Sequence, residues 1–284
     1  METHTSDSQT LAGILKKNLD AMSPSEKKVA RALIADYPVA GLEPVAKLAE
    51  RASVSAPSVL RMLSRIGLHS YTQMQEQLRE EISQRNASPM DMYEAKSSTT
   101  RTDDHLLAQA NSVFTQELSD TFAEVPDTEF DEVVALLANP KVRIWTVGGR
   151  YSSMLAEYLT MHLRMLRPDV HFVGRGESDK SLALLDFGPR DVLVGFDFRR
   201  YQSNTIEFFA RAKESRVKTV LITDPWLSPA AKHADFLLSA SVEAPSPFDS
   251  LVPSLALTEM LIAAVVGALG SEPLGRIQAF DSWE

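Results

Sequence analysis

The stretch that decides the fold is LAERASVSAPSVLRMLSRIG, which runs from Leu48 to Gly67. Its apolar residues recur three and four positions apart in two sets, and a short polar segment separates the sets. This spacing predicts two short amphipathic helices around a tight turn. Ser55 suits the N-cap of the second helix, Pro57 falls within its first turn, and Gly67 suits its C-terminal end. The pattern is typical of a helix-turn-helix unit.

The second of these helices carries polar and positively charged residues opposite its apolar set. Ser58, Arg61 and Arg65 are assigned to that face, with Ser55 and Ala56 at the N-terminal tip. In a helix-turn-helix the tip and the outer face enter the major groove, where arginines contact guanine edges or phosphates. We therefore expect these five residues to contact DNA. An ordinary surface helix with two solvated arginines has the same spacing, so the rest of the chain must distinguish these two interpretations.

The charge distribution favours a nucleic-acid partner for the N-terminal part, although the net charge of the chain is −9. Residues 9–72 contain nine Lys or Arg and five Asp or Glu, whereas residues 86–284 contain 18 and 28. Salt screens phosphate attraction beyond about 10 Å. An acidic second domain therefore does not prevent a local basic surface from binding DNA.

Length and composition predict two globular domains, because the chain has 284 residues of which 44% are hydrophobic. A polar N-terminus and the lack of an unbroken run of 18 apolar residues predict no signal peptide and no membrane partner, so we expect a cytoplasmic protein. The absence of cysteine excludes disulfides, thiolate zinc sites and cysteine nucleophiles. No histidine is spaced with carboxylates as metal ligands require, and no cofactor is expected.

The N-terminal part, residues 1–82, is predicted to be an all-α DNA-binding domain of about five helices. A capping box that starts at Ser23 begins one helix, which ends before Pro38, and the segment 39–43 is expected to be a loop. The last helix of this domain is expected to span Tyr71 to Ile82. Residues 83–104 are polar and contain Pro89 and a Ser/Thr run, which predicts a linker with a partly helical segment near residues 90–95.

From residue 141 onward, short β-branched runs alternate with helical segments. This alternation predicts a doubly wound α/β domain with a parallel sheet, spanning residues 105–284, that receives ligands at the carboxyl ends of its strands. The expected strands are 142–147, 170–173, 192–196, 217–223 and 236–239. The expected helices are 106–122, 130–138, 152–166, 178–185, 205–215, 228–233 and, as the last element, 254–269.

The loop after the first strand is a candidate anion site. Between Gly148 and Ser153 it combines two glycines, Arg150 and two serines directly before a helix, whose free N–H groups bind phosphate or carboxylate. A tight turn with a capping serine has the same pattern. The ligand-binding residues predicted from this loop and from the loop after the third strand are Gly148, Gly149, Arg150, Ser152, Ser153, Arg199, Arg200 and Thr205.

The loop after the third strand places two adjacent arginines before a helix start. Side chains of adjacent residues on extended backbone point in opposite directions, so we expect one of Arg199 and Arg200 to face the ligand. The other is expected to pair with Asp197 or to contact another subunit, although a solvated arginine loop is equally compatible. Asp224, after the fourth strand, is expected to cap the helix that follows, and the alternative is that it closes the floor of the pocket.

Together the two halves resemble the RpiR-type (MurR/RpiR) bacterial transcriptional regulators, which join a helix-turn-helix to a sugar isomerase (SIS) domain that binds phosphosugars. Residues 48–78 carry the first match, with Arg61, Gly67 and Tyr71 in the family's recognition-helix pattern. Residues 147–159 and 217–238 carry the second. The chain departs from the family at Arg150, where a second glycine is usual, and at residues 197–201, where a Ser-x-Ser-Gly-x-Thr loop is usual. This departure implies a ligand other than the usual phosphosugar, such as another acidic metabolite or a sugar acid.

The resemblance implies a regulator without enzymatic activity, which represses carbohydrate or related catabolic genes. It is expected to bind a double-stranded DNA operator as a homodimer or homotetramer and to respond to a small anionic metabolite. One alternative is a sugar-phosphate isomerase with an accessory helical domain. Another is an SIS-like scaffold whose arginine loop makes subunit contacts and binds no ligand.

Overall fold

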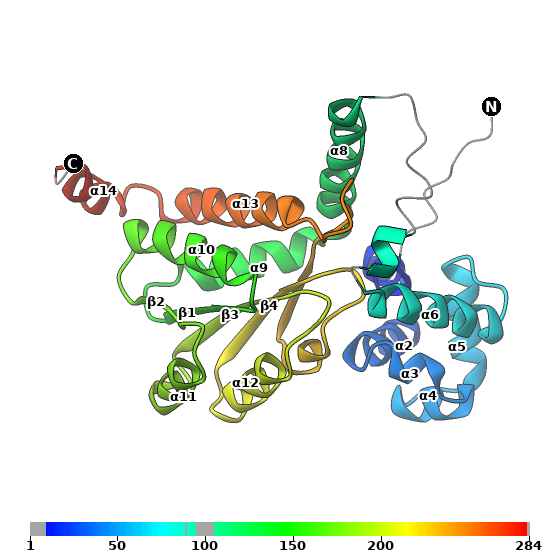
Figure 1. Ribbon diagram of the computed structural model, residues 1–284. Coiled ribbons are helices and arrows are strands. Elements are labelled where there is room, and N and C mark those ends of the chain that lie inside the picture. The colour runs from blue at the N-terminus through cyan, green and yellow to red at the C-terminus, as the bar shows by residue number, and fades with distance from the viewer. Residues whose placement is uncertain (1–9, 89, 95–104, 283–284) are drawn as a thin grey trace.

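The computed structural model describes residues 10–88, 90–94 and 105–282 of the 284-residue chain. A helical N-terminal part lies beside a five-stranded parallel sheet that helices cover on both faces (Figure 1). The predicted class, an all-α part followed by a doubly wound α/β part, is confirmed. The helical part consists of α1 (Leu11–Asn18), η1 (Leu19–Ala21), α2 (Pro24–Ala35), α3 (Val39–Leu42), α4 (Val45–Arg51), α5 (Ala56–Arg65) and α6 (Tyr71–Asn86).

The expected helix-turn-helix is formed by α4 and α5. Leu48, Val59 and Met62 are completely buried, as the apolar spacing predicts. Gly67 ends α5 with a positive φ of 85°, a conformation that glycine adopts without strain. The capping box of α2 is also present, because the Ser23 and Glu26 side chains each accept a hydrogen bond from the other residue's backbone N–H.

The segment 39–43 was wrongly expected to be a loop, because residues 39–42 form the short helix α3. The reason is tertiary. Ala40 is completely buried, and a Cβ added to Gly41 would lie 2.3 Å from Leu78 of α6. One helical turn therefore packs directly against α6, although prolines flank it in the sequence. The helical part has six α-helices instead of about five, and α6 continues four residues past the expected end at Ile82.

The expected linker is only partly within the described chain. Residues 90–94 are helical, as the sequence predicts, and residues 95–104 lie outside the described residues. The domain boundaries at residues 82 and 104 stay predictions.

The α/β part has the strand order β2-β1-β3-β4-β5, with every neighbouring pair parallel. The central strand β3 is buried at every position. Helices α9, α10 and α13 cover one face, and α11, α12 and η2 cover the other (Figure 1). The strands are β1 (Arg143–Gly148), β2 (Val170–Phe172), β3 (Asp191–Asp197), β4 (Lys218–Thr223) and β5 (Phe236–Ser239), each within two residues of its expected bounds.

The helices of this part also match the expected positions, with one omission. The omitted element is α14 (Leu274–Asp281), which has no fully buried residue, although Leu274, Ile277 and Phe280 recur three positions apart in the sequence. The others are α8 (Leu106–Glu124), α9 (Asp127–Ala138), α10 (Ser153–Leu166), α11 (Glu177–Asp186), α12 (Ser203–Glu214), η2 (Pro229–His233) and α13 (Val252–Leu269).

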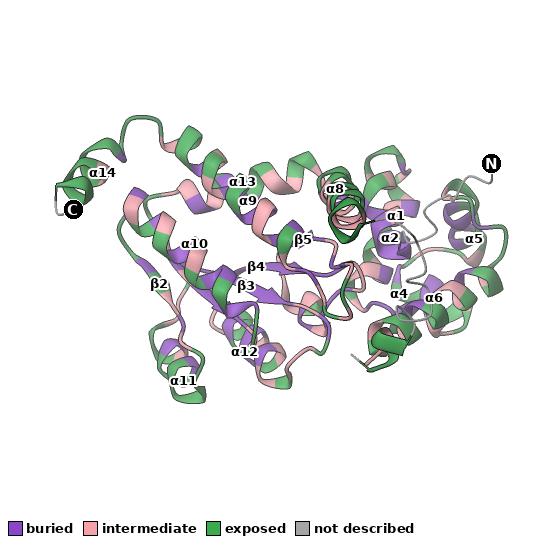
Figure 2. Ribbon diagram, turned by 45° about the horizontal axis from the view of Figure 1, so that its top comes forward, coloured by how far each residue is buried: buried purple, intermediate pink, exposed green. Residues whose placement is uncertain are grey.

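Helix α13 is long and apolar enough to cross a membrane, with a mean hydropathy of 1.9 over 18 residues. In this fold it packs against α8, α9 and α10, and its buried residues belong to the core on that face of the sheet. Only 33% of it is buried, and its outer face is exposed (Figure 2). The helix is thus a covering layer of the sheet with an apolar outer surface.

The helical part contacts the α/β part through polar and apolar side chains. Thr10 Oγ1 donates to the Pro225 carbonyl (3.0 Å), and Lys16 Nζ donates to the Leu237 carbonyl (3.4 Å). Leu227 and Ala230 of the α/β part belong to the same buried apolar cluster as the core of the helical part. A conformational change in the segment after β4 or in β5 therefore acts directly on α1.

The turn from β1 into α10 depends on one of its two glycines. A Cβ added to Gly148 would lie 2.5 Å from the Ser153 backbone, whereas one added to Gly149 would meet no atom closer than 3.4 Å. The first glycine therefore allows the start of α10 to lie against the end of β1.

We predict that Gly148→Ala lowers the free energy of unfolding by about 1–3 kcal/mol, because backbone has to move to accommodate the methyl group. The matched variant Gly149→Ala is expected to change it by less than about 1 kcal/mol. Urea unfolding of both variants measures this difference. Equal effects of the two substitutions would contradict the packing described here.

Candidate functional site

The outer face of α5 is the candidate DNA-reading surface. Arg61 and Arg65 are exposed there, and Ser55 is exposed at the tip beside the half-buried Ala56. Sequence analysis missed three further exposed residues of this face, Pro57, Leu60 and Ser64. Their spacing of three and four positions is the signal that would have identified them.

Ser58 was wrongly assigned to the outer face. It is only 6% exposed, because it lies four residues before the buried Met62 and so shares the inward side of the helix. Its Oγ lies 3.0 Å from Ser55 Oγ and accepts a hydrogen bond from Arg61 (2.8 Å). The N-cap Ser55 makes no hydrogen bond to the helix N-terminus. Ser58 therefore positions the Ser55 and Arg61 side chains from beneath.

The two arginines of this face differ in their partners. Arg65 Nε pairs with Glu26 of α2 at 3.1 Å, and its side chain is 45% exposed. The pKa of Glu26 is lowered, chiefly by the hydrogen bond from the Ser23 backbone and further by Arg65. Among the described residues, Arg61 pairs with no carboxylate. Arg61 is thus the cation of α5 that is available to a phosphate or a base.

The second candidate site lies at the carboxyl edge of the sheet, where the loops after β1 and β3 meet. Ser152 Oγ donates to the Phe196 carbonyl (2.7 Å) and accepts from the Gly149 N–H (2.8 Å). Ser152 therefore joins the two loops, and its hydroxyl is occupied. Ser153 Oγ, at the first residue of α10, is buried and has no hydrogen-bond partner among the described residues.

Arg199 and Arg200 both pair with Asp249, from the segment between β5 and α13. Arg199 contacts Oδ1 through Nε (2.8 Å) and Nη2, and Arg200 contacts Oδ2 (2.9 Å). The expected pairing with Asp197 was wrong, because the chain turns at Arg200, whose φ of 67° directs both side chains toward the Asp249 loop. Arg199 is buried and Arg200 is half-exposed.

Asp224 holds the arginine loop in place. It accepts hydrogen bonds from the Arg199 N–H, the Tyr201 hydroxyl and the Trp226 N–H. The expectation that it caps the following helix was wrong, because Ser228 caps η2 instead. Burial raises the pKa of Asp224 to about 6, against the opposing effect of these hydrogen bonds.

Asp197, at the end of β3, is a second buried carboxyl of this edge. Burial raises its pKa to about 7, and the Ser228 hydroxyl donates to it. Lys180 of α11, which sequence analysis did not single out, is 5% exposed, and burial lowers its pKa. It also borders a cavity of about 150 Å³ between α11 and α12. A buried amine and carboxyl therefore lie close to the predicted anion site.

The guanidinium of Arg199 also contacts the helical part. Its Nη1 donates to the Gln84 carbonyl in the last turn of α6 (3.1 Å), and its Nη2 contacts Met92 Sδ (3.1 Å). Beside it, the Arg85 guanidinium lies over the Tyr201 ring, 4.6 Å from the centroid. The arginine loop is therefore in contact with the end of α6.

The remaining predicted ligand residues divide into two kinds. Arg150 is exposed and makes no ion pair among the described residues, so it is available to an anion. Thr205 is completely buried in α12, and within the described part of the chain its hydroxyl donates to the neighbouring Asn204 side chain (3.5 Å). The described residues contain no group of three or more His, Asp or Glu side chains arranged to hold a metal ion.

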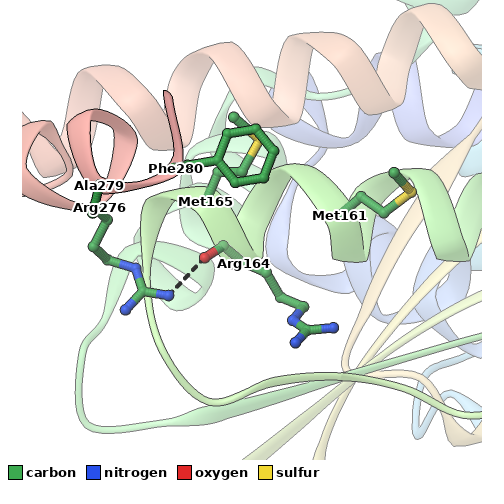
Figure 3. Close-up of a pocket in the computed structure, with 6 residues that line it drawn as sticks. All are labelled: Met161, Arg164, Met165, Arg276, Ala279 and Phe280. Carbon is green, nitrogen blue, oxygen red and sulfur yellow. Dashed lines mark hydrogen bonds between the residues drawn. The ribbon is translucent and has the colours of Figure 1, made fainter. Parts of the chain in front are cut away.

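A larger cavity of about 530 Å³ lies away from the strand ends, between α10 and α14 (Figure 3). Its wall is mostly apolar, and Arg276 at its edge donates to the Arg164 carbonyl (2.8 Å). This lining does not suit a small anion. The lining residues are Met161, Arg164, Met165, Arg276, Ala279 and Phe280.

Comparison with known proteins identifies both parts of the chain. The model of the rpiR-family helix-turn-helix domain matches residues 9–85, and the SIS domain model matches residues 136–264. An uncharacterised HTH-type transcriptional regulator of Thermotoga maritima is 24% identical over 256 residues, which cover 89% of this chain and 87% of the relative.

Two solved structures share the fold. The sugar isomerase domain of an RpiR transcription factor from Sphaerobacter thermophilus matches with a TM-score of 0.60 and 23% identity, covering 63% of this chain and 99% of that domain. The Vibrio vulnificus NanR protein, solved in complex with ManNAc-6P, matches with a TM-score of 0.50 and 18% identity, covering 96% of this chain and 97% of NanR.

The helix-turn-helix model matches the helical part of the structure, and the SIS model matches the part with the parallel sheet. The two domains follow each other in the order that the sequence resemblance implies. The chain belongs to the RpiR-type transcriptional regulators, with an N-terminal helix-turn-helix domain and a C-terminal SIS domain.

Proposed function

We propose that this protein is a cytoplasmic repressor of carbohydrate or related catabolic genes, which binds its operator through α5 and releases it in response to a small anionic metabolite. The DNA-binding half of the proposal rests on the exposed outer face of α5, where Arg61 pairs with no carboxylate among the described residues. Ser55, Ala56 and Arg65 complete the contact surface, and Ser58 supports it from beneath.

The ligand half of the proposal rests on the cations and free donors at the strand ends. Arg150 is free of any ion pair among the described residues, and Ser153 Oγ is a buried hydroxyl without a partner at the start of α10. Free N–H groups at a helix start and arginine side chains both bind phosphate or carboxylate. The complex of NanR with ManNAc-6P supports a phosphosugar-like ligand. Arginine side chains bind phosphate and carboxylate alike, so a sugar acid is the second ligand class that suits this site.

Gly149, Arg150, Ser153, Arg199 and Arg200 are the proposed ligand contacts. Gly148, Ser152 and Thr205 shape the loops around them, because their packing or hydrogen-bonding capacity is already used within the protein.

A homodimer is part of the proposal. Exposed apolar side chains gather on the outer faces of α10 and α13, including Met154, Met161, Met260 and Val266. Exposed apolar side chains on adjoining helices are typical of association sites. A two-fold dimer presents two copies of α5 to half-sites about one DNA turn apart. A sugar-phosphate isomerase is the second candidate, and the absence of turnover across a phosphosugar panel would exclude it.

Substituting the free arginine of α5 tests the DNA surface. We predict that Arg61→Ala weakens operator binding by about 5- to 100-fold at fixed salt, because one base or phosphate contact is lost. Arg65→Ala is expected to have a smaller effect, since Glu26 already pairs with Arg65. The control Arg211→Ala removes an exposed arginine of α12 that pairs only with Glu207. Fluorescence anisotropy with the selected operator measures all three, and equal affinity of Arg61→Ala and Arg211→Ala would refute the assigned face.

Thermal unfolding with a ligand panel tests the anion site. Sugar phosphates, including ManNAc-6P, and sugar acids are expected to raise Tm with increasing concentration, whereas the corresponding neutral sugars are not. Arg150→Ala should reduce the shift produced by the best ligand. A panel in which no anion raises Tm would contradict the ligand half of the proposal and leave the DNA-binding half standing.

The buried Asp197 adds a pH dependence to ligand binding. Since its pKa is about 7, this carboxyl becomes charged as the pH rises from 6 to 8 and then repels a bound anion. We predict that the affinity for a sugar acid, whose own charge is constant in this range, falls by about threefold or more between pH 6 and 8. In Asp197→Asn the fall should be smaller. Calorimetric titration at both pH values measures it, and an unchanged pH dependence in the variant would contradict the assignment.

A further inference from the structure

Arg199 occupies an unusual position, because one buried guanidinium contacts the ligand loops and the DNA-binding domain at the same time. Its side chain is 5% exposed and is surrounded by Asp249, the Gln84 carbonyl, Met92 Sδ and the Trp226 ring, 4.7 Å from the ring centroid. A buried guanidinium is stable only when it is paired and hydrogen-bonded. Any change in its partners therefore has to be compensated by another anion or acceptor.

The contact on the DNA-binding side is the C-terminal end of α6. The Gln84 carbonyl belongs to the last turn, where helix carbonyls lack intrahelical partners and the helix dipole favours a cation. The same carbonyl accepts the Ala87 N–H at 3.2 Å, so Arg199 binds a group that also closes the helix end. Helix α6 in turn packs into the core of the domain through the completely buried Met74 and Leu78. A displacement of Gln84 is therefore transmitted along α6 into the core of the DNA-binding domain.

The contact on the ligand side is a carboxylate. Asp249 bridges Arg199 and Arg200, with one oxygen for each guanidinium. A phosphate or carboxylate of a ligand has the same charge and the same acceptor geometry as this side chain. It is therefore a direct competitor of Asp249 for the two arginines.

We infer that Arg199 is a latch between the effector site and the helix-turn-helix domain, which an anionic ligand opens by taking the guanidinium away from Asp249 and Gln84. The inference rests on the proposed function for the existence of the ligand site, and it adds the residue through which occupancy reaches α6. Opening the latch releases the end of α6 from Arg199, while the contacts of α1 and of Arg85 with the SIS domain remain. The DNA-binding domain then samples a wider range of orientations about these remaining contacts. An effector shifts operator affinity only by its different affinity for the latched and unlatched arrangements.

Two other arginines of the SIS domain lack the bond to Gln84, and the second of them provides the control. Arg200 shares the Asp249 carboxylate with Arg199 but makes no contact with α6 among the described residues. Arg211 lies in the same domain and pairs only with Glu207, four residues earlier on α12. Substitution of either removes one positive charge without removing the bond to Gln84.

The latch is first tested without any ligand. In Arg199→Ala, hydrogen exchange in the last turn of α6 should become about tenfold faster, which corresponds to the loss of one hydrogen bond to a charged group. Arg211→Ala should leave this exchange unchanged. Because Arg199→Ala leaves a buried space, Asp249→Asn serves as a second variant that keeps the shape and removes the anchoring charge, and it should give the same increase.

The relative placement of the domains is measured by spin labels. The chain has no cysteine, so Glu80→Cys on α6 and Glu214→Cys at the end of α12 provide two specific sites. Labelled protein is diluted with an excess of unlabelled protein, so that only distances within one chain contribute. The distance distribution should be narrow in the unsubstituted background and broad when Arg199→Ala is added.

The ligand arm uses inorganic phosphate and ManNAc-6P, with binding established separately by Tm. A ligand that binds should produce the exchange and the broadened distances of Arg199→Ala in the unsubstituted protein. Unchanged exchange in Arg199→Ala overturns the latch whatever the ligands do. Unchanged exchange and distances in protein that has bound a ligand overturn the coupling. If no anion raises Tm, the proposed ligand site fails and the ligand-free arm still decides whether Arg199 holds α6.

Discussion

The structure depends on how a positively charged side chain is accommodated inside the boundary between two domains. Moving a guanidinium out of water costs several kcal/mol unless anions and acceptors replace the lost hydration. Arg199 obtains them from both sides of the boundary, a carboxylate from the SIS domain and a helix-terminal carbonyl from the DNA-binding domain. The placement of α6 and the state of the strand-end loops are therefore linked through this charge, beside the contact of Arg85 with the Tyr201 ring.

The contacts of Arg199 give the loop after β3 a structural role. A serine side chain is neutral and too short to reach across the domain boundary as this guanidinium does. The Asp197 to Tyr201 segment instead provides a buried acid, a buried arginine and a tyrosine whose hydroxyl is anchored on Asp224. The loop thus combines the proposed ligand surface with a structural contact. Burial also raises the pKa of the Tyr201 hydroxyl, which keeps this group protonated as a hydrogen-bond donor.

Most of the fold follows from the sequence because its signals are local. The helical spacing of Leu48, Val59 and Met62 and the β-branched runs of the sheet place each element within a few residues. The failures were tertiary. Helix α3 forms because Gly41 allows contact with α6. Helix α14 is short, and only Ile277 of its apolar residues packs against the core.

The site was less predictable than the fold for the same reason. No sequence pattern connects Arg199 with Asp249, which lies 50 residues later, or with Gln84, which lies 115 residues earlier. The sequence did predict the helices of the helix-turn-helix and the loops after β1 and β3 in which the proposed contacts lie. It assigned Ser58 to the wrong side because a serine carries no apolar signal, and the hydrogen bonds to Ser55 and Arg61 that explain its burial are visible only in the structure.

Selection of binding sites from a random pool of duplexes, with full-length protein and with each anionic metabolite present or absent, tests the central claim most directly. The account predicts enrichment of a palindromic sequence with half-sites about one helical turn apart, and loss of that enrichment with at least one anion. A pool without any enriched sequence under both conditions, at low ionic strength, would contradict it.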